Sequence, residues 1–537
     1  MERDMLMDDT DRIVVVGAGL SGLAALKELL EAGLNAVCYE KRLDIGGVFS
    51  EGGTYDSVEL TVSNYFMAYS DLMPYGEEVR FWSRKEYKDY LDKYAEKFHL
   101  RERIIFDRTL DILEEHESGQ WTAHFKNSHG VVESVTAQRV VICSGQFQKP
   151  NIPSLKGLDS FNGPVIHSSQ YKNAELLKAF HNKKVLCFGM GESAADVIAE
   201  VASVAKKTIL SLRRHHMFSS RYVSREKKKF GYATIDVLQS RYYHSLPAAL
   251  KTDKVRKVAQ DAVDHPSYED GKPTARQLMC EHVLSAGDEP GSVVTKTERI
   301  FEAQSKYDFI VDATGVERIE GHKVTFISGK EETFDAILLC TGFRFDLPFL
   351  PERYQFKDIR DCYLQMFHPN LKETVSFVGF ARPQQGGVPL MAEMQSRYLA
   401  QVLNGQKTLP EDMADQAHKD ADKWRHEFYE TPNVFGLVNG LRFNEHLAEL
   451  IGCVPPVPNI LLSPQKYFCY WFSHVWPSQY RLQGPGAREE AKQHWHKAPS
   501  ATGWKQNVKS WLMMLYLRRR KGPHFDEKHR WRPILPR

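Results

Sequence analysis

The chain has 537 residues, and its 71 basic and 69 acidic side chains give a formal charge of +2. This length exceeds what one hydrophobic core usually serves, so two or more domains are expected. The near balance of charges argues against a nucleic-acid-binding protein, which normally concentrates basic residues on one face. Residues 1–12 are acidic and no run of about 18 uncharged apolar residues occurs. We therefore expect neither a secretory signal nor a membrane-spanning helix, and a location in the cytoplasm.

The eight cysteines are widely spaced and form no CxxC or other metal-binding pair. This spacing argues against a zinc site and against a redox dithiol, so no metal is expected. Four of them lie within or at the ends of apolar, strand-like runs, where cysteine behaves as a small hydrophobe. A reducing compartment is the simplest interpretation.

The chain begins with the pattern of a β-α-β unit. Residues 12–16 form a short apolar run that is typical of a strand buried on both faces. Apolar residues at helical spacing over 20–32 predict a helix, and residues 35–39 predict a second strand. This order predicts a parallel sheet, and hence an α/β fold.

The turn between this strand and its helix carries a GxGxxG motif made of Gly17, Gly19 and Gly22. The first glycine allows a tight turn, the second lets a pyrophosphate approach the backbone, and the third lets helix and strand pack closely. The phosphates would then bind the free N–H groups at the helix N-terminus. Glu40 ends the second strand, where a carboxylate accepts hydrogen bonds from a ribose diol. The unit therefore predicts a site for FAD or NAD.

A second unit of the same kind begins with the apolar run 184–188. Its turn contains Gly189, Gly191 and Ser193, with an alanine as the third small residue. Arg213 and Arg214 stand at the end of the next strand, where the first unit has its acid. Guanidinium groups bind a 2′-phosphate by forked, charge-assisted hydrogen bonds, whereas a carboxylate would repel it. The second site is therefore expected to bind NADPH.

Two dinucleotide sites in one chain narrow the chemistry, because one cofactor must receive hydride from the other. A flavin that accepts hydride from NADPH is the usual arrangement, so the first cofactor is expected to be FAD. A disulfide reductase would need a dithiol beside the flavin, and the cysteine spacing offers none. O2 is then the leading electron acceptor.

The segment between the two glycine turns indicates a family. Residues 161–172 match the pattern FxGxxxHxxx(Y/F)K, with His167 at its centre and Tyr171-Lys172 at its end. In this the chain resembles the class B flavoprotein monooxygenases, and among them the flavin-containing monooxygenases. Similarity to this family extends over about residues 12–490, including 337–343 and 477–486. His167 is expected to bridge the two lobes near the nicotinamide cofactor, although a lone histidine is more often structural.

Matching to the family adds two further site residues. The resemblance implies that Asn64 lies beside the reactive flavin carbon and donates to the peroxide, although this segment is about three residues shorter than in the animal enzymes. The alternative is that Asn64 caps a turn. Gln385 precedes a predicted helix from 389 to about 402, whose N-terminus would stabilise the reduced flavin ring. An ordinary helix start is the alternative there.

The resemblance implies that O2 adds to the reduced flavin as a C4a-hydroperoxide, which a small soft nucleophile attacks, either an amine nitrogen or a sulfur. A Baeyer–Villiger monooxygenase acting on ketones is the nearest alternative, but its identifier usually ends in Trp-Pro where this chain has Tyr171-Lys172. An amino-acid N-hydroxylase is another relative. From a different class, a non-catalytic NADPH-binding protein remains an alternative.

The predicted architecture is two Rossmann-like domains, with the NADPH domain inserted into the FAD domain. We place the FAD domain at 1–168 and 325–450, and the NADPH domain at 169–324 with a helical insertion at about 215–273. Residues 451–537 are expected to form a C-terminal extension packed on the FAD domain. Within it, the basic and apolar segment near 508–520 is a candidate for peripheral membrane contact. A homodimer is left open.

Overall fold

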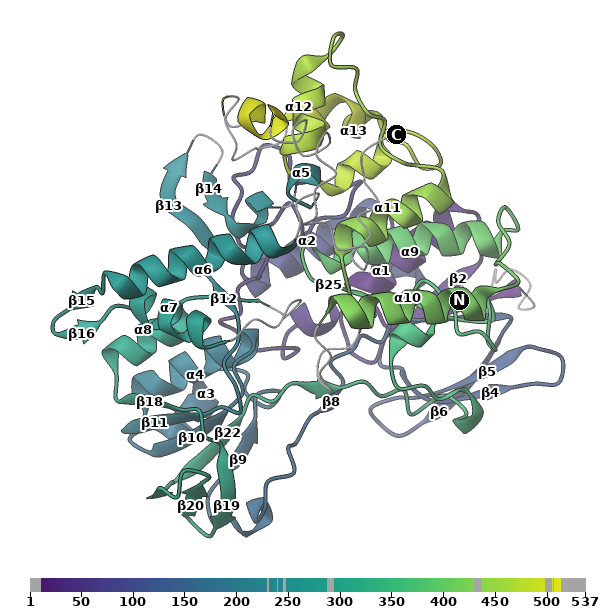
Figure 1. The fold of residues 1–537 in the computed structure, drawn as a ribbon. Coiled ribbons are helices and arrows are strands. Elements are labelled where there is room, and N and C mark those ends of the chain that lie inside the picture. The colour runs from purple at the N-terminus through teal and green to yellow at the C-terminus, as the bar shows by residue number, and fades with distance from the viewer. Residues whose placement is uncertain are drawn as a thin grey trace.

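The computed structural model describes residues 11–512, except 229–230, 239, 245–247, 287–293, 429–435, 498–504 and 506. It has two lobes, each built around a parallel sheet (Figure 1). We call the lobe that holds the first glycine turn the first domain, and the lobe that holds the second turn the second domain.

The first domain contains a five-stranded parallel sheet in the order β24-β7-β1-β2-β3. Its strands in chain order are β1 (Ile13–Val16), β2 (Ala36–Tyr39), β3 (Ile104–Ile105), β7 (Arg139–Ile142) and β24 (Val375–Phe377). All four residues of β1 are buried, because both faces of the sheet are covered. Helix α1 (Leu20–Glu31) packs against α9 (Val388–Leu403), and both bury their apolar side chains in the main core.

The second domain contains a parallel sheet in the order β18-β11-β10-β22-β9. Its strands are β9 (Val165–His167), β10 (Lys184–Phe188), β11 (Lys207–Ser211), β18 (Phe309–Asp312) and β22 (Ala336–Leu339). The sequence-based boundaries assign β9 and β22 to the first domain, but both strands pair within the second sheet. An apolar strand pattern shows that a strand exists and not which sheet it joins, so both boundaries of the second domain shift outward to include β9 and β22.

The chain crosses between the domains twice, and the two crossings lie side by side. Strand β8 (Lys149–Pro150) on the outward path pairs antiparallel with β23 (Phe343–Arg344) on the return path. Figure 1 shows β8 between the two lobes. The two crossing segments are therefore paired with each other as strands.

The predicted helical insertion is only partly helical. It contains helices α5 (Arg241–His244) and α6 (Ala248–Asp264), but a hairpin of β13 (Tyr222–Lys228) and β14 (Gly231–Thr234) precedes them. Short strands flank these elements, namely β12 (Phe218–Ser219), β15 (Tyr268–Glu269), β16 (Lys272–Pro273) and β17 (Thr295–Lys296). Helices α7 (Ala275–Ser285) and α8 (Arg299–Lys306) then complete the second domain together with α3 (Ala174–Leu177) and α4 (Glu192–Val204).

Smaller elements complete the fold. Helix α2 (Arg84–Lys97) begins with a capping box formed by Ser83 and Glu86. Two antiparallel sheets are formed by β4 (Thr109–Glu115), β5 (Trp121–Lys126) and β6 (Val132–Ala137), and by β19 (Val316–Glu320), β20 (Lys323–Phe326) and β21 (Glu331–Thr333). After α9 come α10 (Met413–Glu427), α11 (Gly440–Ile451), α12 (Pro464–Phe472) and α13 (Glu489–His494), and β25 (Arg382–Pro383) pairs with β26 (Leu437–Val438).

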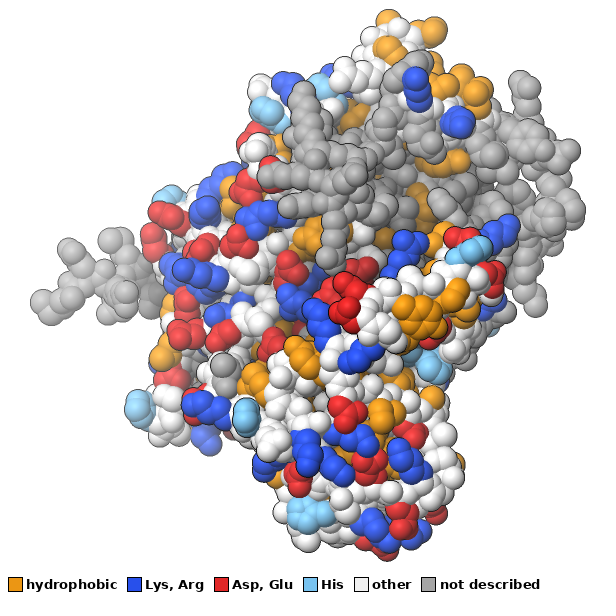
Figure 2. All heavy atoms as spheres, turned by 90° about the vertical axis from the view of Figure 1, so that its left-hand side faces the viewer, with side chains coloured by type: hydrophobic (Ala, Val, Ile, Leu, Met, Phe, Trp, Pro, Cys, Tyr) orange, Lys and Arg blue, Asp and Glu red, His pale blue; other side chains and the backbone are white. Residues whose placement is uncertain are grey.

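The predicted interfacial segment near 508–520 lies largely outside the described residues, which end at 512. Within the described part of the chain, no helix combines the length and the apolar character needed to cross a bilayer. On the face drawn in Figure 2, basic and acidic side chains are interspersed over the second domain.

Candidate active site between the two nucleotide-binding turns

The first glycine turn requires its glycines for steric reasons. Gly17 has a φ of +99°, and a Cβ on it would lie 2.8 Å from the Cys143 carbonyl oxygen. A Cβ on Gly22 would lie 1.7 Å from the Gly17 carbonyl oxygen, which no side chain tolerates. Gly19 caps α1 without a side-chain hydrogen bond, so the N–H groups of the first helical turn stay available to a phosphate.

Glu40 lies beside this turn, as the sequence predicts. The Ala18 N–H donates to one of its carboxylate oxygens at 2.6 Å, and the Arg42 N–H donates to the other at 2.9 Å. The residue is 3% exposed. These bonds hold the carboxylate at the carboxyl end of β2, next to Gly17, where a nucleotide ribose is expected.

Sequence reasoning missed a second glycine pair that closes the same site. The Gly46 N–H donates to the Ala18 carbonyl at 2.9 Å. Gly47 has a φ of +58°, and a Cβ on it would approach the Gly19 Cα to 3.1 Å. The Gly-Gly dipeptide was visible as a turn signal, but its contact with the first turn depends on tertiary structure.

The second turn repeats this geometry. Gly189 has a φ of +96°, and a Cβ on it would lie 2.1 Å from the Cys340 carbonyl oxygen. Gly191 caps α4 and has open space at its Cβ position, and both Gly191 and Ser193 are exposed. This turn is therefore accessible at a helix N-terminus, where a pyrophosphate binds favourably.

Arg213 and Arg214 lie at the same sheet edge as the second turn. Phe188 of β10 pairs with Ser211 of β11, so the residues that follow the two strands are neighbours. Arg213 is exposed and Arg214 is half-buried. His216 lies close to both: burial and then the charge of Arg214 lower its pKa to about 4, so it is neutral at physiological pH. The cations at this edge are therefore the two arginines.

Asn64 is fully buried, and its side chain is committed to its own domain. Its amide nitrogen donates to the Glu78 carbonyl at 2.9 Å, and its oxygen accepts from the N–H groups of Tyr65 and Arg80. These contacts support the turn-stabilising alternative. A catalytic role for Asn64 stays a prediction.

His167, the last residue of β9, contacts the chain where the return crossing begins. One ring nitrogen lies 3.0 Å from the Gly342 carbonyl on the return path, and the other lies 2.9 Å from the Ser169 hydroxyl. Burial lowers the pKa of the imidazole, so it is neutral and donates to the Gly342 carbonyl. Both nitrogens are therefore occupied within the second domain, and contact with a cofactor stays a prediction.

Gln385 lines a small pocket at the N-terminus of α9. The wall includes residues from five parts of the chain, among them Phe66, His244, Asn444 and Tyr480. Gly387, the N-cap of α9, lies so close to the Phe66 carbonyl oxygen that a Cβ on it would approach to 1.9 Å. The start of α9 therefore faces a hollow between the first domain, the insertion and the C-terminal region.

Segment 55–64 of the first domain is tied to the second domain by polar contacts. The Tyr55 hydroxyl donates to Asp196 of α4 at 3.0 Å, and the Ser63 N–H donates to Asp236 at 2.6 Å. Arg221 pairs with Glu59. These contacts hold the residues next to Asn64 against the second domain.

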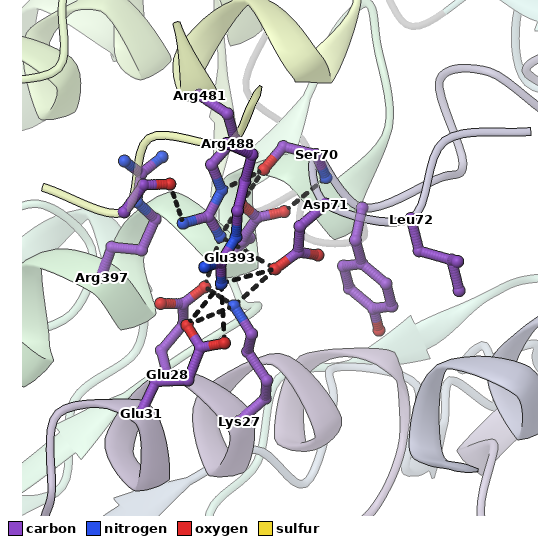
Figure 3. Close-up of polar contacts among 12 residues, drawn as sticks. Lys27, Glu28, Glu31, Ser70, Asp71, Leu72, Glu393, Arg397, Arg481 and Arg488 are labelled. Atoms are coloured by element: carbon purple, nitrogen blue, oxygen red, sulfur yellow. Dashed lines mark hydrogen bonds and ion pairs between the residues drawn. The ribbon is translucent and has the colours of Figure 1, made fainter. Parts of the chain in front are cut away.

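The C-terminal region is anchored on α1 and α9 by a buried ion network (Figure 3). Arg481 is fully buried and contacts Glu28 of α1 at 2.6 Å and Glu393 of α9 at 2.7 Å. Lys27 contacts Asp71 at 2.5 Å. The network therefore ties the C-terminal region to both helices.

Comparison with known proteins agrees with this geometry. Residues 10–509 match the family described as flavin-binding monooxygenase-like. The 4-hydroxybenzoate brominase (decarboxylating) of Marinomonas mediterranea is 38% identical over 89% of this chain and 91% of its own. Flavin-containing monooxygenase 5 of Cavia porcellus is 28% identical over 91% of each chain. The structure of the OTEMO complex with FAD and NADP has a TM-score of 0.61 and 13% identity, and covers 83% of this chain and 98% of its own.

These comparisons confirm the resemblance and the predicted α/β fold with two Rossmann-like domains. The last of them also holds the cofactor pair that the sequence predicts. The chain belongs to the flavin-binding monooxygenase-like family.

Proposed function

We propose that this chain is an NADPH- and O2-dependent flavin enzyme that oxidises bromide and so brominates a phenolic acid related to 4-hydroxybenzoate. The observation that carries this proposal is the 38% identity to a 4-hydroxybenzoate brominase (decarboxylating) along nearly the full length of both chains. The sequence alone favours an amine or a sulfur as the nucleophile. Bromide is also soft and polarisable, so it fits the same oxygen transfer.

The two turns would divide the cofactors between them. FAD would bind at Gly17, Gly19 and Gly22 with its ribose at Glu40, because no side chain caps the N-terminus of α1 at this turn and an acid lies beside it. NADPH would bind at Gly189, Gly191 and Ser193 with its 2′-phosphate on Arg213 and Arg214. Bound together, these groups supply hydride transfer and the activation of O2.

The chain's own residues would hold the reacting groups. The contacts of segment 55–64 keep the first domain against the second, which supports this arrangement. The overall chemistry balances without a further reductant. NADPH and bromide each give two electrons to O2, and with two protons the products are water and hypobromous acid. Transfer of bromine to the ring carbon that carries the carboxylate releases CO2 and leaves a bromophenol.

The test is turnover of the purified yellow holoenzyme with NADPH, O2, 4-hydroxybenzoate and potassium bromide. We expect oxidation of NADPH and formation of 4-bromophenol, which mass spectrometry identifies by the paired masses of the bromine isotopes. Omission of bromide or of O2 serves as the control and should abolish the product. NADPH consumption without any brominated product, with bromide and the acid present, would exclude the brominase proposal.

A second candidate is oxygenation of an amine or thioether, as the sequence predicts. It is supported by the identifier that ends in Tyr171-Lys172 and by the similarity to flavin-containing monooxygenase 5. Formation of an N-oxide or sulfoxide without any requirement for bromide would favour this candidate. Ester formation from a ketone would favour the Baeyer–Villiger alternative.

A further inference from the structure

Arg382 is a cation of the first domain, close to the second, that lacks a protein partner among the described residues. Arg382 begins β25, which follows the carboxyl end of β24 in the first sheet. Ligands of such folds bind outside the carboxyl ends of the parallel strands. Within the described part of the chain, the half-buried Arg382 guanidinium has no hydrogen bond and no ion pair. Burial lowers its pKa, and the attraction of Glu192 in the second domain only partly offsets this effect.

The other buried arginines in the described part of the chain have protein partners, either carboxylates or, for Arg397, the carbonyls of Tyr480 and Pro485. Arg481 contacts Glu28 at 2.6 Å, and Arg241 contacts Glu445 at 2.8 Å. A charge taken out of water is costly unless an opposite charge compensates it. Arg382 departs from this pattern, which indicates that its counter-charge comes from a bound anion.

Glu192, the carboxyl group whose charge acts on Arg382, does not neutralise it. One carboxylate oxygen of Glu192 accepts from the Lys296 N–H at 3.0 Å, and the other is buried without a hydrogen-bond partner among the described residues. Burial raises the pKa of this carboxyl, which favours its protonated form. The Arg382 guanidinium and one carboxyl oxygen of Glu192 are therefore both without a protein partner among the described residues.

The position of Arg382 places it beside the reaction site. It precedes Gln385, which lines the pocket at the start of α9, by three residues. At roughly 3.3 Å per extended residue, the two backbones lie within roughly 10 Å of each other. Glu192 lies in the first turn of α4, directly after Gly191 of the second nucleotide turn. Arg382 thus stands between the sites expected for the two cofactors.

We propose that Arg382 binds the carboxylate of the aromatic substrate and thereby selects aromatic acids over neutral phenols. The planar guanidinium offers two parallel N–H donors that match a carboxylate. This inference rests on the proposed function, since it takes the substrate to be a phenolic acid.

The test compares binding of 4-hydroxybenzoate with binding of the neutral 4-hydroxybenzamide, using the absorbance change of the flavin in the holoenzyme. The proteins are the wild type, Arg382→Met, Arg382→Lys and the control Arg353→Met, which alters an exposed arginine paired with Glu115. We expect Arg382→Met to weaken binding of the acid by roughly 10- to 100-fold and to leave binding of the amide unchanged. Arg382→Lys should recover part of the loss, because it keeps the charge without the fork.

Equal affinity of the wild type and Arg382→Met for the acid would overturn the assignment. So would a wild type that binds acid and amide equally, or an Arg382→Met variant whose affinity falls only for NADPH, because the residue would then serve the coenzyme. The flavin spectrum and the melting temperature verify folding, and Arg382→Lys carries the test if the Met variant loses FAD. Acid binding that depends on Arg382 without any brominated product would refute the proposed function and leave the assignment intact. If Arg382→Met still brominates with an unchanged KM for 4-hydroxybenzoate, the assignment of Arg382 would be refuted and the proposed function would stand.

Discussion

Arg213 and Arg214 follow β11 at the sheet edge that also holds the second glycine turn. We propose that at this edge they distinguish NADPH from NADH, which differ by one phosphate. Hydrogen bonds to charged groups contribute about 1.5–3 kcal/mol each. We therefore expect the double substitution Arg213→Ala, Arg214→Ala to raise the KM for NADPH on the order of 100-fold and to change the KM for NADH little.

Steady-state kinetics with both coenzymes measures this difference. Lys178→Ala is a suitable control, because this lysine is exposed on the same domain and pairs only with Glu175 among the described residues. An equal rise of the two KM values would show that the arginines do not bind the 2′-phosphate.

Asn64 offers a second prediction about a single side chain. Its amide joins the 63–65 turn to the backbone of Glu78 and Arg80. Removal of one partner of a buried hydrogen bond costs about 1–3 kcal/mol. We therefore expect Asn64→Ala to lower the melting temperature by a few degrees, and Asn64→Asp to lower it as well, because the carboxylate has no donor for the Glu78 carbonyl. Normal stability combined with a lost product yield would instead favour the catalytic role that the family resemblance implies.

The two glycine turns are elements that local sequence predicts well. In each unit the strand, the turn and the helix are consecutive, and the acid or arginine that follows the next strand lies beside the turn because neighbouring parallel strands end at the same edge. Gly46 and Gly47 are a different case. They pack against the first turn through contacts with Ala18 and Gly19. No periodic pattern in the sequence predicts these contacts.

Two glycine substitutions separate folding from cofactor binding in these turns. A Cβ on Gly22 would overlap the Gly17 carbonyl, so Gly22→Ala should prevent close packing of α1 and yield protein without FAD. A Cβ on Gly191 meets no protein atom within 4 Å. We therefore expect Gly191→Ala to keep its FAD and its melting temperature but to bind NADPH at least about tenfold more weakly, because the methyl group occupies space needed by the pyrophosphate. Flavin absorbance and NADPH titration measure both effects, and unchanged NADPH affinity would argue against this phosphate site.

At the scale of the whole molecule, the arrangement of the domains depends on long-range contacts that sequence patterns do not predict. Ser63 and Asp236 meet across 173 positions of the chain, and the insertion that carries Asp236 has no pattern that points to Ser63. For the same reason, the sheet that β9 and β22 join could not be assigned from their composition. Both strands are short apolar runs that suit either sheet equally well.

The network around Arg481 joins the C-terminal region to the first domain. We expect the protein to lose stability when Arg481 is replaced. Arg481→Met would leave Glu28, Asp71 and Glu393 buried without this cation, and breaking a buried ion pair in this way costs about 3–5 kcal/mol. The control Arg353→Met removes an exposed partner of Glu115 outside the network, and exposed pairs contribute about 1 kcal/mol or less. At pH 7 we expect Arg481→Met to lower the melting temperature by several degrees more than the control.

The difference should depend on pH because Glu28 titrates differently in the folded protein. Burial alone would raise the pKa of Glu28, but Arg481 and Lys27 outweigh it and hold the pKa at about 2. A carboxyl whose pKa is lowered on folding contributes stability above its unfolded pKa of about 4.3, and this contribution is lost as the pH falls toward 2. Without Arg481 most of that contribution is absent at every pH. The gap in melting temperature between the wild type and Arg481→Met should therefore narrow as the pH falls from 7 to about 3, whereas a constant gap would show that lost packing, and not charge, is the cause.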